Sequence, residues 1–276
     1  MKAGFYKGII FILLAGAILW LLSHFLDGEK KPLTLIATTT TETSGFLDYI
    51  IPLAEKDTGI KIRIISFGTG KVLRSAQDGN ADLILVHDPL SEENFIQQGH
   101  GLKRYPVMMN NFILVGPKHD PAGIGQYSTI EEIFGKLHQD KTAFISRGDD
   151  SGTHKAEQRI WQSLGLEPAF FSSQWYKKSG AGMGRSLNIA VESGAYILCD
   201  QASWLTFHNK GDLIILHQDD EKLKNIYSLI PVNPLKHPHL QAEKAQKVID
   251  WFLSAQARNH IRAFKHQGKT LYIPIS

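Results

Sequence analysis

Short apolar runs rich in β-branched residues alternate with helical patterns from residue 33 onward. The runs at residues 33–39, 60–67 and 81–88 are each followed by a helical pattern, and "ADLILV" in the third is almost wholly apolar. A nearly continuous apolar strand is typical of a sheet covered on both faces. Strand–helix alternation of this kind predicts βαβ units around a parallel sheet. The predicted fold class is therefore α/β.

Two extended stretches, "KRYPVMMNNFILVGP" and "NIYSLIPVNP", interrupt this alternation in the middle and near the end of the chain. The longest helical pattern, residues 240–268, follows the second stretch. We therefore expect two α/β lobes joined by extended crossings near residues 113–118 and 224–230, with the C-terminal helices returning to the first lobe. The predicted division gives residues 31–115 plus 228–276 to the first lobe and residues 116–227 to the second.

The first 30 residues form a separate unit. Lys2 and Lys7 precede a run from Ile9 to Leu26 that is apolar apart from three residues. A basic start followed by a long apolar run indicates export, and the lysines predict that the remainder faces outward. The run has nearly the length needed to span a bilayer, and no clean small-x-small cleavage site precedes Asp27. A cleaved signal peptide and an uncleaved membrane anchor both remain open.

Composition excludes several classes of protein. With 43% hydrophobic and 21% charged residues, the chain is ordinary for a globular protein. The net charge of +3 comes from scattered basic residues, which argues against nucleic-acid binding. Cys199 is the single cysteine, so an internal disulfide and a lipid-modified cysteine after the apolar run are both excluded. His237 and His239 lack partners at metal-binding spacing, and neither a metal nor a cofactor is predicted.

Turns rich in glycine and hydroxyl residues follow four of the predicted strands. In open α/β sheets, ligands bind beyond the carboxyl ends of the strands, where the next helix begins. Glycines let backbone N–H groups approach a ligand, and Ser and Thr hydroxyls add donors that rotate to suit it. Arg147 adds a permanent charge and a rigid donor fork. The turns are "ATTTTETSG" (37–45), "SFGTG" (66–70), "SRGDDSGT" (146–153) and "SGAGMG" (179–184).

Helix capping alone would explain any single one of these turns, since Ser and Thr are favoured caps and glycine is common in loops. Four such turns spread over both predicted lobes favour one shared site for a small oxyanion. Each charge-assisted hydrogen bond contributes about 1.5–3 kcal/mol, so several are needed to offset desolvation of the anion. Asp149 and Asp150 would repel an anion, and we expect them to cap the following helix and brace the loop or Arg147.

Taken together, five segments resemble the tungstate-binding proteins of tungstate ABC importers, over roughly residues 33–234. The resemblance implies a type II periplasmic-binding-protein fold whose two lobes close on an oxyanion. It also implies delivery of the anion to a membrane permease and its ATPase. The segments are "TTTTETSGFLDYIIPLAEKDTGIKI", "GTGKVLRSAQDGNADLILVHDP", "NNFILVGPKHDPAGI", "FISRGDDSGTHKAE" and "GAGMGRSLNIA".

The resemblance also implies which residues form the site. The family arginine maps onto Arg147, and the family serine maps onto Thr40 or Thr41, depending on the end from which the threonine stretch is aligned. Backbone groups around Gly182 to Gly184 are carried over as well. The full predicted set of ligand-binding residues is Thr39, Thr40, Thr41, Thr69, Arg147, Ser151, Thr153, Gly182 and Met183.

The predicted function is an extracytoplasmic, monomeric solute-binding protein that captures tungstate and delivers it to an ABC permease. Molybdate is nearly isosteric and is an expected second ligand, whereas a site made only of donors disfavours protonated phosphate. The alternative is a membrane-anchored oxyanion sensor or regulatory domain. An exported enzyme using Ser151 or His154 would lack an orienting acid at a recognisable spacing, so the chain is predicted not to be an enzyme.

Overall fold

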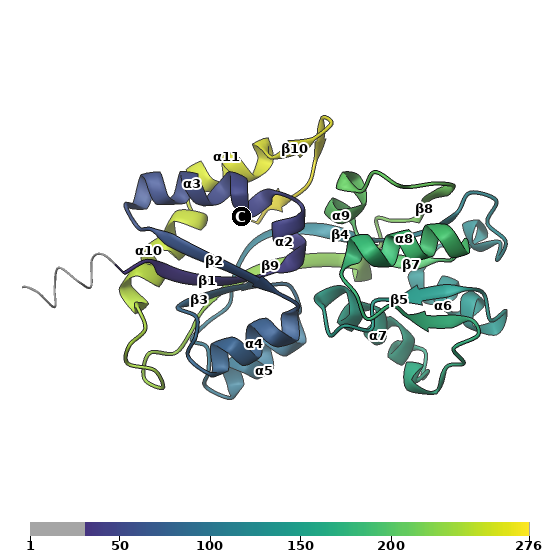
Figure 1. Cartoon of the computed structure of the whole chain (residues 1–276), viewed down its shortest axis with the longest axis horizontal. Helices are drawn as coiled ribbons and strands as arrows, with labels where there is room; N and C mark the ends of the chain where they lie inside the picture. Colours follow the sequence, from purple (N-terminus) through teal and green to yellow (C-terminus); the bar gives the residue numbers. More distant parts are fainter. Residues whose placement is uncertain (1–30, 276) are drawn as a thin grey trace, which may run out of the picture.

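The computed structural model describes residues 31–275, so the predicted signal peptide or anchor lies outside the described residues. Figure 1 shows two lobes side by side, with β4 (Tyr105–Pro117) and β9 (Lys224–Pro231) running between them. None of the helices in this part of the chain has both the length and the apolar character needed to cross a membrane.

The first lobe begins with three parallel strands in the order β2-β1-β3, connected by helices as predicted. The rest of its sheet differs from the prediction, because β9 pairs antiparallel with β3, and β4 pairs antiparallel with β9. The sheet is therefore mixed. The elements are β1 (Leu33–Thr38), α2 (Thr39–Thr43), α3 (Phe46–Thr58), β2 (Ile62–Phe67), α4 (Thr69–Gln77), β3 (Leu83–Val86) and α5 (Pro89–Gln97).

The C-terminal segment packs against α3 in this lobe, with Trp251 donating through Nε1 to Asp57 at 2.8 Å. The helical pattern at residues 240–268 forms two helices and not one continuous helix. Ser254 starts a new helix by accepting from the Ala257 amide at 3.1 Å, and a hairpin follows. The elements are α10 (Ala242–Phe252), α11 (Ala255–Ala263), β10 (Lys265–His266), β11 (Lys269–Thr270) and β12 (Ile273–Pro274), which pairs with β4.

The second lobe is built on the far half of β4, which changes partner from β9 to β7 between Asn111 and Phe112. β6 pairs in parallel with β5, and the turn at residues 179–184 follows it. The residue limits proposed for the lobes stay a prediction. The elements are η1 (Ile124–Gln126), α6 (Ile130–Gln139), β5 (Phe144–Ser146), α7 (Gly152–Ser163), η2 (Pro168–Phe170), β6 (Tyr176–Lys178), α8 (Met183–Ser193), β7 (Ile197–Asp200), α9 (Gln201–Thr206), β8 (Leu213–His217) and η3 (Glu221–Leu223).

Candidate functional site

The glycine-rich turns of the two lobes meet each other directly. The amide of Gly70, at the start of α4, donates to the carbonyl of Asp150 in the second lobe at 3.2 Å. A Cβ at Gly70 would lie 1.6 Å from Asp150 Oδ2, and one at Gly152 would lie 2.4 Å from Cε1 of His87. A side chain at Gly152 would meet a buried ring and hold the lobes apart, whereas the exposed Asp150 carboxylate can turn away from one at Gly70. Gly152 therefore serves lobe closure, and helix capping alone does not account for it.

Arg147 lies at this junction and is only 3% exposed. Its Nε donates to the carbonyl of Ala181 at 2.8 Å, and Nη2 pairs with the carboxylate of Asp149. The other oxygen of Asp149 accepts from the Ser151 amide at 3.2 Å. The predicted bracing role of Asp149 is therefore confirmed, and it fixes the direction of the guanidinium.

The predicted aspartate cap of α7 is wrong. Ser151 is the N-cap residue, and its Oγ accepts from the His154 amide at 3.3 Å. Asp150 instead adopts a left-handed backbone conformation, with φ 57°, and its carboxylate faces cations from both lobes. Lys155 contacts it at 3.0 Å and Arg74 of the first lobe at 3.4 Å. These two cations neutralise the acid that would otherwise repel an anion.

Several buried hydroxyls at this junction are without a hydrogen-bond partner among the described residues. They belong to Thr38 at the end of β1, Thr69 at the start of α4 and Thr153 at the start of α7. All three side chains are 2% exposed or less. A buried hydroxyl without a partner costs free energy, so three of them on facing loops fit a site whose acceptors come from a ligand. Thr38 is not in the predicted set, although it belongs to the same threonine stretch.

The remaining predicted hydroxyls have different surroundings. The stretch from Thr39 to Thr43 is a short helix, α2, in which Thr39 is half-buried. Thr41 donates its hydroxyl proton to the Thr38 carbonyl at 2.8 Å, so this proton already has an acceptor. Thr40 lies 3.4 Å from Nε2 of His87. Of the two positions that could match the family serine, Thr40 is therefore the one directed at the lobe junction.

Two longer helices begin near the junction without a side-chain cap. Gly68 precedes α4 and Gly182 precedes α8, and neither supplies a capping oxygen. The N-terminal amides and the positive end of each helix dipole favour an anion. Between α2 of the first lobe and α8 and α9 of the second lies a cavity of about 190 Å³, lined by Thr43, Met183, Gly184, Ser203, Thr206 and Phe207. The structure thus brings the predicted Gly182 and Met183 to the boundary between the lobes.

Comparison with known proteins places the chain in a family. A family model described as a PBP superfamily domain matches residues 27–256. The tungstate-binding protein TupA of Peptoclostridium acidaminophilum is 40% identical over 249 residues, which cover 89% of this chain and 86% of that protein. The chain belongs to the family of TupA tungstate-binding proteins.

Solved structures of family members share the fold. The tungstate-binding protein TupA from Desulfovibrio alaskensis G20 has a TM-score of 0.77 at 37% identity, and the match covers 89% of this chain and 100% of that one. The tungstate ABC transporter structure from Geobacter sulfurreducens has a TM-score of 0.76 at 37% identity, with 85% and 99% covered. The predicted fold class and the family resemblance are both confirmed.

The sequence did not predict a polar cluster that lies beside the candidate anion site. Asp200, fully buried at the end of β7, accepts from Tyr227 at 2.8 Å, Asn110 at 2.9 Å and Asn225 at 2.8 Å. Asn110 and Asn225 are opposite each other on the crossing strands β4 and β9. His87 joins the cluster through a 2.7 Å contact between its Nδ1 and Asn225 Oδ1. The signal was present as polar residues within or at the ends of apolar strand runs, which buried strands otherwise avoid.

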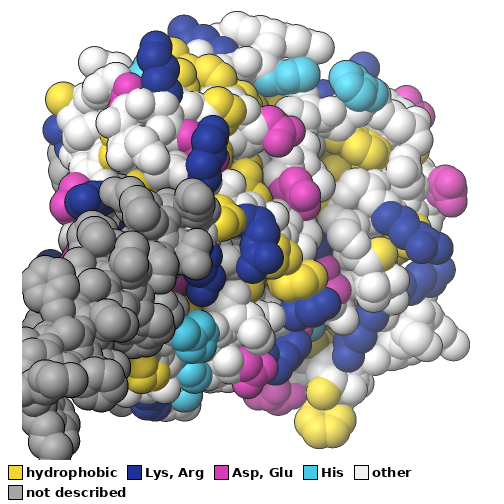
Figure 2. Space-filling model, turned by 60° about the vertical axis from the view of Figure 1, so that its left-hand side comes forward, with side chains coloured by type: hydrophobic (Ala, Val, Ile, Leu, Met, Phe, Trp, Pro, Cys, Tyr) yellow, Lys and Arg dark blue, Asp and Glu magenta, His cyan; other side chains and the backbone are white. Residues whose placement is uncertain are grey.

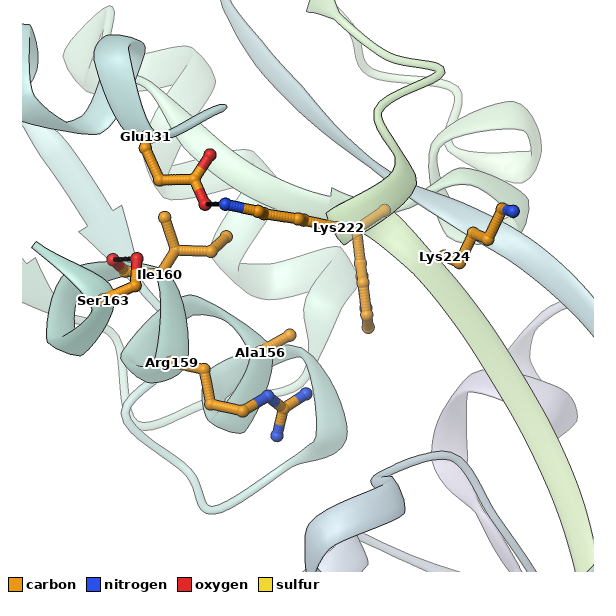
Figure 3. A pocket seen from close by; sticks show the side chains of 8 residues that line it. Glu131, Ala156, Arg159, Ile160, Ser163, Lys222 and Lys224 are labelled. Atoms are coloured by element: carbon orange, nitrogen blue, oxygen red, sulfur yellow. Dashed lines mark hydrogen bonds and ion pairs between the residues drawn. The ribbon is translucent and has the colours of Figure 1, made fainter. Parts of the chain in front are cut away.

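A second pocket, of about 300 Å³, carries three cations (Figure 3). Each of them has an acidic partner. Lys222 pairs with Glu131, Lys224 with Glu221 and Arg159 with Asp88. An incoming anion would have to displace these carboxylates. Arg147 is also paired with an acid, but its junction adds buried hydroxyls without a partner among the described residues, and none of the residues lining this pocket supplies one. The pocket is therefore a poorer anion site than the junction around Arg147. Its lining residues are Phe112, Glu131, Ala156, Arg159, Ile160, Ser163, Lys222 and Lys224.

Charged side chains of both signs are mixed on one face of the molecule. On the face shown in Figure 2, Lys and Arg side chains are interspersed with Asp and Glu and form no continuous basic stripe. Within residues 31–275, no group of three or more His, Cys, Asp or Glu side chains is placed to hold a metal ion. His237 and His239 instead contact the backbone carbonyls of Gln77 and Gly79.

Proposed function

We propose that this chain is the solute-binding component of an ABC importer, which captures tungstate outside the cytoplasm and delivers it to a membrane permease. Molybdate, which is nearly isosteric, is the expected second ligand. The names of the relatives support this role over the sensory alternative. One observation carries the proposal. Buried hydroxyls on loops of both lobes have no hydrogen-bond partner within residues 31–275, and they lie beside the oriented guanidinium of Arg147.

The geometry accounts for how such a site would bind. A tetrahedral dianion presents only acceptors, so its four oxygens match hydroxyl, amide and guanidinium donors. Thr38 and Thr69 supply donors from the first lobe, whereas Arg147 and Thr153 supply them from the second. An anion held by both lobes stabilises the closed form, and closure removes the water that would weaken each hydrogen bond.

The hydrogen bonds of Ser151 and His154 argue for binding without catalysis. Ser151 uses its hydroxyl as the cap of α7, and Nδ1 of His154 accepts from the amide of Asp150 at 3.2 Å. The Ser151 hydroxyl is not hydrogen-bonded to a ring nitrogen of His154, as a nucleophile and its general base would be. We infer that the site releases its anion unchanged.

The test is isothermal titration of the purified protein with tungstate, molybdate, sulfate and phosphate. We expect tight one-to-one binding of tungstate and molybdate and none of phosphate. An Arg147→Ala variant should lose at least about a hundredfold in affinity, since it removes charge-assisted hydrogen bonds, while Arg262→Ala on the exposed face of α11 should lose none. Tungstate binding that survives Arg147→Ala unchanged would place the site elsewhere.

A further inference from the structure

His87 lies where the two lobes and the crossing strands meet, and it is 2% exposed. Its ring stacks on Tyr227 of β9, with centroids 4.7 Å apart, and faces Gly152 of the second lobe. Nδ1 lies 2.7 Å from Asn225 Oδ1, and Nε2 lies 3.4 Å from Thr40 Oγ1. One imidazole therefore connects a threonine of the candidate anion site to the polar cluster at the crossing strands.

The carboxylate of Asp200 fixes which nitrogen of His87 carries a proton. A carboxylate only accepts, so the amide nitrogens of Asn110 and Asn225 point toward Asp200, at 2.9 and 2.8 Å. Asn225 Nδ2 also donates to Asn110 Oδ1 at 2.8 Å, which leaves Asn225 Oδ1 facing His87. An amide oxygen is an acceptor, and therefore Nδ1 of His87 carries a hydrogen in both protonation states.

Only Nε2 changes when His87 titrates, and this nitrogen faces Thr40. In the neutral ring Nε2 is an acceptor, so the Thr40 hydroxyl donates to it and turns its hydrogen away from an anion. In the charged ring Nε2 donates to the Thr40 oxygen, which frees the hydroxyl hydrogen for an anion oxygen. The charged ring also places a positive charge beside the site.

The groups around His87 act in opposite directions on its charge. Burial lowers the pKa of His87 below its ordinary value of 6.5, and the positive charge of Arg147 lowers it further. The carboxylates of Asp200 and Asp88 raise the pKa, as does the hydrogen bond to Asn225, but burial dominates. A dianion at the Thr40 and Arg147 loops would add negative charge and favour the imidazolium.

We propose that His87 is a positioning residue of the oxyanion site, which takes up one proton from solvent as the anion binds and thereby turns the Thr40 hydroxyl toward it. The proposal rests on the proposed function, because it needs an oxyanion at these loops. Binding then consumes a proton wherever His87 is neutral in the free protein and charged in the complex. The pKa of His87 in the free protein lies below 6.5, so this range begins below pH 6.5, and within it the dissociation constant should rise by up to about tenfold for each pH unit.

The first test needs no variant. Tungstate is titrated into the full protein in two buffers of different ionisation enthalpy, at several values between about pH 5 and about pH 8.5. The difference in heat counts the protons taken up per anion, and we expect a value approaching one. Tight binding with no proton uptake and a constant affinity would overturn this role of His87 and leave the proposed function standing. No tungstate binding at any pH would instead overturn the proposed function.

Substitutions test which residue takes up the proton when the anion binds. His87→Gln cannot become charged, so its proton uptake should vanish and its affinity should be weaker and independent of pH. Glu157, whose pKa burial raises to about 7, is the competing site of proton uptake, and Glu157→Gln should keep the uptake. His208→Gln, at an exposed histidine, controls for substitution alone. Proton uptake that persists in His87→Gln, or that disappears in Glu157→Gln, would contradict the assignment. Imidazole ¹⁵N chemical shifts of His87 that are typical of a neutral ring in the complex would contradict it as well.

Discussion

Asp88 of the first lobe forms an ion pair with Arg159 of α7 in the second lobe, and this contact lies across the closed junction. The Asp88 side chain is 2% exposed and also accepts from the Ser91 amide at the start of α5. Figure 3 shows the Arg159 guanidinium extending away from α7 and from the other cations of its pocket. The pair therefore couples closure of the lobes to residues that do not touch the candidate anion site.

Replacing Arg159 should weaken anion binding by destabilising the closed form. Arg159 contacts Asp88 across the closed junction. In Arg159→Gln the buried Asp88 carboxylate therefore has no cation beside it in the closed form, which raises the free energy of that form. Because the Arg159 side chain is 35% exposed, we expect a moderate effect, with tungstate dissociating about tenfold faster. Stopped-flow displacement measures this rate. Lys136→Gln, which removes an ion pair with Asp140 inside one helix, should leave the rate unchanged.

Gly152→Ala should block closure directly. The added Cβ would lie 2.4 Å from the His87 ring, and neither group can move away without disturbing the junction. We expect the tungstate dissociation constant to rise by more than about tenfold, with the thermal stability of the free protein nearly unchanged. Small-angle scattering with and without tungstate would show whether the variant stays open.

The control for this change is Gly135→Ala in α6, where a Cβ would meet nothing within 4 Å. Alanine inside a helix is favoured over glycine by about 0.5–1 kcal/mol, so this variant should gain stability and bind as the parent does. Equal affinities of the Gly152→Ala variant and the parent would mean that the binding-competent state is more open than the structure.

The sequence predicted the strand–helix alternation of the first lobe and the loops that meet at the junction, because apolar periodicity and glycine-hydroxyl turns are local signals. It did not predict the antiparallel pairing of β9 with β3 and β4, which depends on how the chain returns between the lobes. His87 and Asp200 were missed for a related reason. Each is one polar residue at the end of an apolar strand, and its role comes only from partners such as Asn225, more than twenty residues away in the chain.

Thr69→Val should separate binding from stability. The Thr69 hydroxyl is buried and has no hydrogen-bond partner among the described residues, so valine of similar shape removes a desolvation cost. We expect an equal or higher melting temperature together with a tungstate affinity at least about tenfold lower. Thr41→Val is the matched comparison, because it removes a bond to the Thr38 carbonyl and should cost about 1 kcal/mol of stability. The opposite pattern would assign the ligand to Thr41.

Glu157 should make the folded protein less stable as the pH rises. It is buried in α7, where Tyr176 donates to it at 2.6 Å and Trp161 at 3.1 Å. Burial raises the pKa of Glu157 from 4.5 to about 7, and these hydrogen bonds only partly oppose the shift. The folded state therefore holds the proton more tightly than the unfolded chain. The free energy of unfolding should fall between about pH 4.5 and about pH 7, by about 3 kcal/mol in all.

Glu157→Gln removes the titrating group while its amide oxygen can still accept from Tyr176 and Trp161. We expect the variant to lose most of this pH dependence and to exceed the parent in stability at about pH 8, where the parent carries a buried charge. Urea unfolding at intervals from about pH 5 to about pH 8 measures both effects, and Glu192→Gln on the exposed face of α8 should follow the parent curve. If Glu157→Gln and the parent have parallel curves, the proton on Glu157 does not contribute, and any remaining slope comes from other buried groups such as His87.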